Sequence, residues 1–204
     1  MNDARNHGRC GKVRWKRAAL LMVPSLTAAA ALVTLTMRGS IAANFTIAGD
    51  EFKISADRLD GAGLVQFTGL DKDSKGRSEH VLITGIRSAE MRNMCASMLA
   101  DTPAGPITLL LRSGRDTPVR ATSLVIDLTR METGATFEGL ALGRDAASLS
   151  GGPNDVLGAP GQYGQQAKRL QLTGFRLQTQ AVTAGNFMFA GLKIAVKPGR
   201  HECF

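Results

Sequence analysis

Side chains that could do chemistry are sparse in this 204-residue chain once the first 43 residues are set aside. The strongest metal ligands, nucleophiles and bases after that point are two cysteines, Cys95 and Cys203, and two histidines, His80 and His201. None of them stands in a C-x-x-C or H-x-x-x-H pattern, the spacings that bring two ligands to one metal ion. The sequence therefore predicts no metal site and no bound cofactor.

An ester hydrolase would need an activated serine, and the sequence offers no motif for one. No G-x-S-x-G nucleophile elbow occurs in the chain. His80 follows Glu79 at the start of an apolar run, where a histidine is more often a surface residue than a general base. Acidic pairs such as Asp50 and Glu51 stand near turns, where carboxylates usually cap and solvate the backbone. We therefore predict no catalytic residue.

A glycine-rich segment, residues 151–164, is the part of the chain best suited to ligand contacts. It lacks the Lys and Ser/Thr of a phosphate-binding loop, so it predicts a long surface loop. Long surface loops often act as lids or binding edges. Within residues 150–166, the candidate ligand-contacting side chains are Tyr163, Gln165 and Gln166.

The excess positive charge of the chain is concentrated at its N-terminus. The chain has 25 Lys and Arg against 17 Asp and Glu, a net charge of +8. Seven of those cations and one of the acids precede residue 44, which leaves 18 basic and 16 acidic residues in the remainder. Because that remainder is nearly neutral and has no basic run, we predict no nucleic-acid binding.

The first 43 residues have the order of a signal sequence. Residues 18–37 contain no charged side chain and follow a group of five cations between residues 9 and 17. Positive residues of this kind stay in the cytoplasm while the apolar stretch enters the bilayer. Small residues at Ala42 and Ala43 offer two cleavage sites, but twenty uncharged residues also suffice for an uncleaved anchor, and Arg38 keeps that alternative open.

This segment defines the expected domain organisation and location. We predict that residues 1–43 are a signal peptide, or an N-terminal membrane anchor, which contacts the membrane during export. Residues 44–204 are then a single β-rich domain that is secreted or held in the cell envelope, outside the cytoplasmic membrane.

Export would carry Cys95 and Cys203 into an oxidising compartment, whereas Cys10 would remain with the leader. An even pair of cysteines in such a compartment predicts a disulfide, with two free thiols or an intermolecular bridge as the alternatives. A crosslink that closes a loop of roughly 110 residues would stabilise the fold by about 4 to 5 kcal/mol on the chain-entropy model.

Alternating apolar and polar residues dominate the chain after residue 44. The period of two that a half-buried strand requires occurs in residues 45–47, 52–54, 124–128, 170–172, 187–189 and 192–196. The break at residues 183–186 lies between two long alternating runs and predicts a hairpin with a four-residue loop. We expect a mainly β fold of repeated long antiparallel hairpins, packed as a sandwich or a solenoid-like stack of sheets, with at most one short helix.

Two further patterns bear on this fold. Five glycines, at positions 69, 85, 139, 174 and 191, each follow a large apolar residue by two positions, which suggests that one supersecondary unit is reused. Their irregular spacing does not establish a strict solenoid. Residues 88–100 place Met91, Met94, Cys95 and Met98 on the stripe of an amphipathic helix, yet they also fit the repeated strand pattern. Helix and strand both stay open for this segment.

The chain resembles a family of secreted actinobacterial proteins of unassigned function, many of which carry the label cholesterol esterase. The resemblance rests on residues 14–43, on the segments 52–59, 163–167 and 183–185, and on the terminal Glu202-Cys203-Phe204. It implies export, a shared β-rich domain and a disulfide. It places no catalytic motif on any residue of this chain.

Three functions are compatible with these observations. The first is a non-enzymatic envelope or extracellular protein, either structural or binding a lipid or other apolar ligand between its sheets. The second is a secreted lipid or sterol ester hydrolase. The third is a surface protein that self-assembles into a homo-oligomer through exposed strand edges.

Overall fold

The computed structural model describes residues 45–72, 78–154 and 156–204, which all belong to one compact unit, Ala42–Phe204. The predicted leader and its candidate cleavage sites at Ala42 and Ala43 lie outside the described residues. Within the described ranges, no helix is both long enough and apolar enough to cross a membrane. The strands are β1 (Phe45–Lys72), β2 (Ser78–Arg92), β3 (Met94–Thr102), β4 (Gly105–Ser113), β5 (Val119–Glu138), β6 (Ala141–Asp145), β7 (Tyr163–Ala184), β8 (Asn186–Met188) and β9 (Lys193–Pro198).

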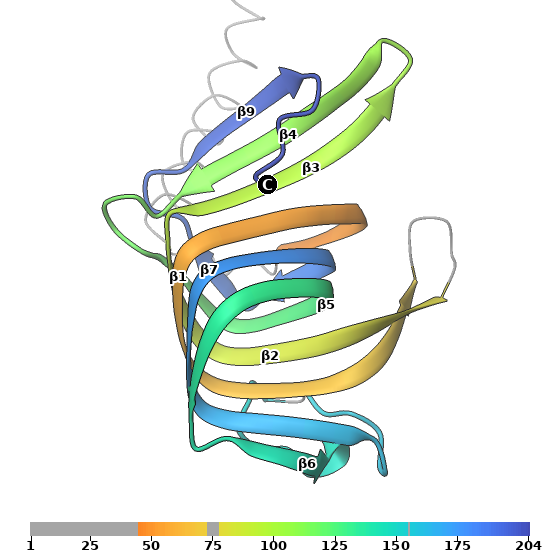
Figure 1. The fold of residues 1–204 in the computed structure, drawn as a ribbon, viewed down its shortest axis with the longest axis vertical. Coiled ribbons are helices and arrows are strands. Elements are labelled where there is room, and N and C mark those ends of the chain that lie inside the picture. Colours follow the sequence, from red (N-terminus) through yellow and green to blue (C-terminus); the bar gives the residue numbers. More distant parts are fainter. Residues whose placement is uncertain (1–44, 73–77, 155) are drawn as a thin grey trace, which may run out of the picture. The chain divides into compact units, whose positions relative to one another are not determined.

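These strands form a nine-stranded sheet in which every pairing is antiparallel (Figure 1). The only helical segment among the described residues is a 3₁₀ helix, Ala146–Ser148. The predicted mainly β fold is therefore confirmed. The segment 88–100, which could have been helix or strand, is the end of β2 and most of β3.

The sheet closes on itself through its four longest strands. β1 pairs with β2, β2 with β5, β5 with β7, and β7 again with β1. Most of the length of these strands is therefore paired on both sides, whereas residues 130–138 of β5 pair only with β7. The interior of this ring is filled by large apolar side chains, among them Phe52, Leu59, Leu64, Ile86, Leu124 and Phe175.

The long strands bend together at two levels, which we call the first and second bend rows (Figure 1). In the first row, Asp57 lies between Asn93 and Gly174, whose φ angles are 51° and 57°. In the second row, Gly63 has a φ of 71° and Ser123 a φ of 50°. The strand segments between the rows form what we call the middle wall, which comprises residues 58–62, 88–92, 119–122, 134–138 and 169–173.

Each bend changes which side chains face the core. In β7 the buried residues Leu170 and Leu172 alternate and the next buried residue is Phe175, a spacing of three across Gly174. The same spacing separates Met91 from Met94 across Asn93. A residue with positive φ rotates the strand, so that the other set of alternate positions points inward. This rotation produces the helix-like stripe in residues 88–100.

Two sequence predictions are wrong, one about a hairpin and one about a repeated unit marked by glycines. Residues 183–186 are not a hairpin, because β8 continues along β5 in the register of β7, and Gly185 N donates to Thr122 O at 2.9 Å. The five repeated glycines do not share one role either. Positions 139, 174 and 191 have positive φ angles, whereas Gly69 and Gly85 lie in strands without one.

A loop and the 3₁₀ helix cover the outer face of β1 and β2 beyond the second bend row. Val65 and Phe67 pack there against Ala146 and Leu149, a second and smaller core. Asp145 fixes both ends of this cover, since its carboxylate accepts hydrogen bonds from Ala147 N at 2.9 Å and Gly161 N at 3.0 Å. The glycine-rich segment is therefore partly buried rather than a free surface loop.

Candidate functional site

The predicted ligand-contacting residues Tyr163, Gln165 and Gln166 lie at the start of β7 and do not share one face. The Tyr163 hydroxyl donates to Gln165 Oε1 at 3.2 Å, and Gln165 Nε2 donates to Gln66 Oε1. Gln66 is buried and donates onward to Thr84 Oγ1 at 2.9 Å. Tyr163 and Gln165 thus begin a chain of hydrogen bonds that enters the closed sheet.

Gln166 points to the opposite side of β7, where it holds the covering loop. Its Oε1 accepts hydrogen bonds from Ser150 N at 3.0 Å and Gly151 N at 3.2 Å. Arg87 binds the other side of this segment, with Nη2 donating to Gly151 O at 2.9 Å and to Gly152 O at 3.2 Å. Gln166 therefore anchors the loop, and its role as a ligand contact stays a prediction.

The interior of the closed sheet has little empty space. A cavity of about 30 Å³ lies among mostly apolar side chains that include Leu59, Ile126 and Phe175. A volume of this size holds about one water molecule. An apolar ligand of lipid size therefore needs a site outside the ring.

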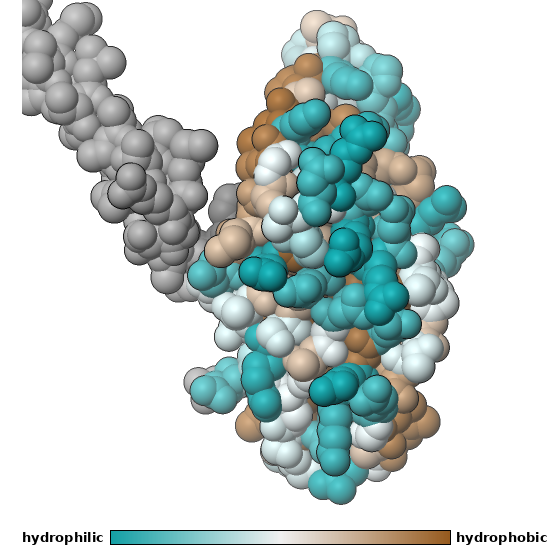
Figure 2. Space-filling model, turned by 90° about the vertical axis from the view of Figure 1, so that its left-hand side faces the viewer, coloured by the Kyte–Doolittle hydropathy of each residue, from teal (hydrophilic) through white to brown (hydrophobic). Residues whose placement is uncertain are grey.

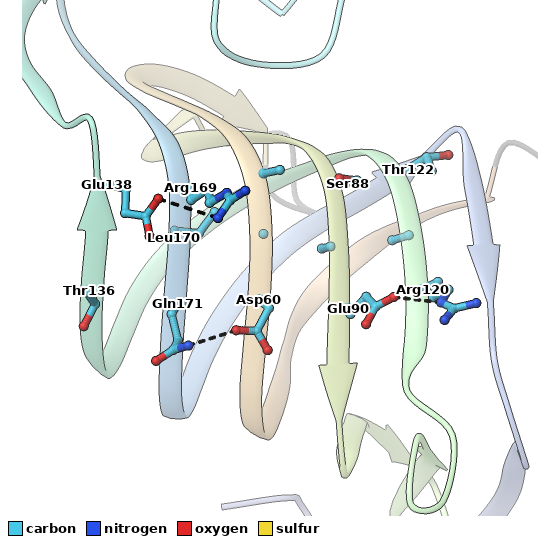
Figure 3. Close-up of a pocket in the computed structure, with 14 residues that line it drawn as sticks. Asp60, Ser88, Glu90, Arg120, Thr122, Thr136, Glu138, Arg169, Leu170 and Gln171 are labelled. Atoms are coloured by element: carbon cyan, nitrogen blue, oxygen red, sulfur yellow. Dashed lines mark hydrogen bonds and ion pairs between the residues drawn. The ribbon is translucent and has the colours of Figure 1, made fainter.

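A groove of about 670 Å³ lies on the outer face of the middle wall (Figure 3). Two rows of outward-facing residues cross it, each row running from strand to strand in register. One row is Thr136, Gln171, Asp60, Glu90 and Arg120, and the other is Glu138, Arg169, Ala62, Ser88 and Thr122. Polar residues accordingly cover the centre of the view in Figure 2.

Ion pairs fix the carboxylates of this groove. Arg58 binds Asp60 through two hydrogen bonds of 2.6 and 2.8 Å, and Gln171 Nε2 donates to the same carboxylate at 3.1 Å. These hydrogen bonds, led by the one from Arg58, lower the pKa of Asp60. Glu90 accepts from Arg120 Nε at 2.8 Å (Figure 3). Asp60 therefore remains ionised, and the groove presents acceptors and donors in set positions.

A second candidate surface is what we call the apolar face, on the sheet of β3, β4 and β9. Because directly paired residues point to the same side, one side of this sheet carries Met98, Ile107, Leu109, Leu111, Ile194 and Val196. Ile194 is 60% exposed and Val196 is 63% exposed. Figure 2 shows apolar side chains gathered at the upper left, at the height that these strands occupy in Figure 1.

The other side of this sheet is covered by the C-terminal segment 199–204. Cys203 forms a disulfide with Cys95 in β3, with a Cα–Cα distance of 5.9 Å. Cys203 N donates to Ser97 Oγ and His201 N donates to Thr108 Oγ1, both at 3.0 Å. These contacts bury Ser97 and Thr108, so the apolar face is the open side of the sheet.

Asp127 carries the one raised carboxyl pKa that is resolved among the described residues. Burial between β2 and β7 raises it, and the charge of Asp71 adds to the rise. Ionisation is therefore less favourable in the folded protein than in the unfolded chain. The pKa of the Asp127 carboxyl is therefore higher in the folded protein than in the unfolded chain. As the pH rises from the lower of these two values through the higher one, the free energy of unfolding falls, and the fall is complete above the higher value.

We expect Asp127→Asn to raise the free energy of unfolding at pH 7 and to leave it nearly unchanged at pH 3, because the wild-type side chain is already neutral there. Urea unfolding of both proteins at the two pH values measures this difference. An equal gain at both pH values would show that charge is not the cause.

Metal ligands do not converge anywhere in residues 45–72, 78–154 and 156–204, where no group of three His, Cys, Asp or Glu side chains could hold an ion. The sequence prediction also missed the groove. Its residues come from four strands, and the register that aligns them depends on pairing between segments more than 100 residues apart.

The fold and its surfaces define an all-antiparallel β protein with a closed sheet, a polar groove and an apolar face. A family model described as a family of unknown function (DUF6230) matches residues 48–204, and the chain belongs to this family. No curated protein and no solved structure matches the chain.

Proposed function

We propose that this protein is an exported, non-enzymatic protein of the cell envelope that attaches to a lipid surface through its apolar face. The observation that carries this proposal is the exposure of Ile194 and Val196, adjacent on one side of an edge strand. Large apolar side chains that gather on an open surface mark a site for a protein or membrane partner.

The surrounding structure favours a lipid surface. The apolar face continues into the main core, since Met98 and Leu111 pack against it, so the face is held rigidly. Lys193 and Lys197 alternate with the two exposed residues along β9, and Arg112 pairs with Lys193 across β4, so these three cations point to the other side of the sheet. The face therefore meets a lipid surface through its apolar side chains.

A non-enzymatic role fits the positions of the titratable groups. His80 lies in β2 near the hairpin to β1, whereas His201 lies in the C-terminal segment, with its Nε2 atom 3.0 Å from Pro198 O. The two candidate bases therefore belong to different parts of the fold. The closed ring supports a binding role outside the sheet, because its interior cavity is too small for a lipid chain.

The test is co-sedimentation of the protein from culture fluid with vesicles of phosphatidylcholine and phosphatidylglycerol. We expect the double variant Ile194→Ser, Val196→Ser to weaken vesicle binding about tenfold or more, because each side chain would bury apolar area in the bilayer. Leu142→Ser is the matched control, since Leu142 is 61% exposed on β6, outside the apolar face.

Several results would contradict the proposal. Recovery of the protein only from the cytosol, and neither from the culture fluid nor from the cell envelope, would count against export. Equal binding by wild type and the double variant would count against the apolar face. A double variant that loses a homodimer while vesicle binding is unchanged would instead favour self-assembly along the edge of β9. Thermal unfolding of each variant shows whether the fold is retained.

A further inference from the structure

We propose that the groove on the middle wall binds a neutral, hydroxyl-rich chain, that is, an oligosaccharide. This site is separate from the apolar face and does not rest on the lipid-binding proposal. Its volume of about 670 Å³ lies within the range of about 300 to 1,000 Å³ found for ligand pockets.

The shape of the groove suits an elongated ligand that crosses the strands. Neighbouring strands lie about 4.8 Å apart, so five adjacent strand segments give a length of about 19 Å. The second row of outward residues has short side chains from its centre to one end, where Ala62, Ser88 and Thr122 follow one another. The larger side chains of the first row rise beside it (Figure 3). A trough therefore runs along the short side chains with a polar wall beside it.

The close packing beneath the trough keeps its floor flat. Gly61 faces inward, and a Cβ atom at this position would collide with the Leu170 side chain. Ala89 and Ala121 on the neighbouring strands also face inward and are buried. The floor therefore has no large side chain that could move into the trough and fill it.

The charges of the groove are nearly balanced. Its charged lining residues are Asp60, Glu90, Glu138, Arg120 and Arg169, and Arg58 and Arg92 lie close enough to act on Asp60. The ion pairs are Asp60 with Arg58, Glu90 with Arg120, and Glu138 with Arg169. A phosphate or sulfate would gain attraction from the arginines and lose it to the adjacent carboxylates. Balanced fields favour an uncharged ligand.

The donors and acceptors identify hydroxyl groups as the partners. A hydroxyl both donates and accepts, so it can donate to a carboxylate while it accepts from a neighbouring guanidinium or amide. The first row runs from Gln171 through Asp60 and Glu90 to Arg120, so each carboxylate has an amide or a guanidinium donor on one side. An extended peptide would instead need free backbone groups for strand addition, and the three central segments of the middle wall, in β7, β1 and β2, are paired on both sides.

The test is an NMR titration of the protein as it is purified from the cells that express it. Hexasaccharides of glucose, mannose and N-acetylglucosamine are added to millimolar concentration, and backbone amide shifts are recorded. We expect at least one of them to shift the amides of Ala62, Ser88 and Glu90. We expect Ser88→Trp, which fills the trough from an exposed position, to raise the Kd about tenfold or more.

Glu90→Gln provides a second variant that keeps the shape of the side chain. We expect it to raise the Kd about fivefold, because a hydrogen bond to a charged group is replaced by a neutral one. Glu132→Gln is the control, since Glu132 is an exposed carboxylate paired with Arg130 outside the groove, and its Kd should equal that of wild type.

Three outcomes overturn the proposal. They are no amide shifts with any of the three sugars, shifts confined to residues outside the middle wall, and an unchanged Kd in both groove variants. Binding of a sulfated hexasaccharide or of an extended peptide in place of the neutral sugars would also overturn it. Vesicle binding by the apolar face is measured separately, so either proposal can fail without the other.

Discussion

Replacing Cys95 and Cys203 together by alanine is expected to lower the free energy of unfolding by about 4 kcal/mol, the scale for a crosslink that closes a loop of about 100 residues. The two cysteines are 108 residues apart in the chain. In the unfolded state the crosslink restricts that whole segment, and its removal restores the lost conformational freedom. Urea unfolding of the variant, compared with the oxidised wild type, measures the change.

The hydrogen bonds of the C-terminal segment limit the loss in the folded state. Cys203 N and His201 N each donate to a buried hydroxyl, and Lys53 Nζ pairs with Glu202 at 3.1 Å. We therefore expect the variant to fold with the segment still on its sheet. Wild type that has been reduced should unfold at the same urea concentration as the variant. A loss below about 1 kcal/mol, with the crosslink verified by mass in the wild type, would contradict the entropic account.

Gly63→Ala is expected to lower the free energy of unfolding by about 3 kcal/mol or more, the range of the most damaging single substitutions. Gly63 has a φ of 71°, and a left-handed conformation costs an alanine about 1 to 2 kcal/mol. A Cβ atom there would also collide with Gly151 O and approach Arg87 Cβ to 2.9 Å. The substitution therefore strains the second bend row and displaces the loop that Arg87 holds.

Gly174→Ala is the matched control for this prediction. Gly174 has a φ of 57°, but a Cβ atom there would meet no atom within 4 Å. We expect it to lose only the conformational part, about 1 to 2 kcal/mol. The difference between the two variants, measured by urea unfolding, reports the packing of the loop on the second bend row. Equal losses would show that this packing contributes nothing.

The strand content could be predicted from the sequence because alternation is a local signal. The turns could not, because the same residues serve different purposes. Gly185 and Asn186 have the composition of a hairpin loop, yet they continue a strand along β5. The apparent helix stripe at Met91, Met94 and Cys95 arises from two strands joined across the positive φ of Asn93.

The two candidate surfaces could be predicted to different degrees. Leu192, Ile194 and Val196 alternate in the sequence, and only the structure shows that Ile194 and Val196 lie on an exposed edge strand. The groove had no local signal, because Asp60 and Gln171 are neighbours only through the pairing of β1 with β7. A chain that is read one segment at a time does not reveal which polar residues will line up across a closed sheet.

The ring of four strands also sets the order in which this chain can fold. β1 lies between β2 and β7, so its second partner is synthesised more than 90 residues after its own last residue. Contacts so distant in sequence make folding slow. Until residues 163–184 have been made, β1 has only half of its pairing, and an incomplete sheet of this kind gains little stability. Delayed closure would suit the export that we propose, because a translocation channel passes chains that are still unfolded.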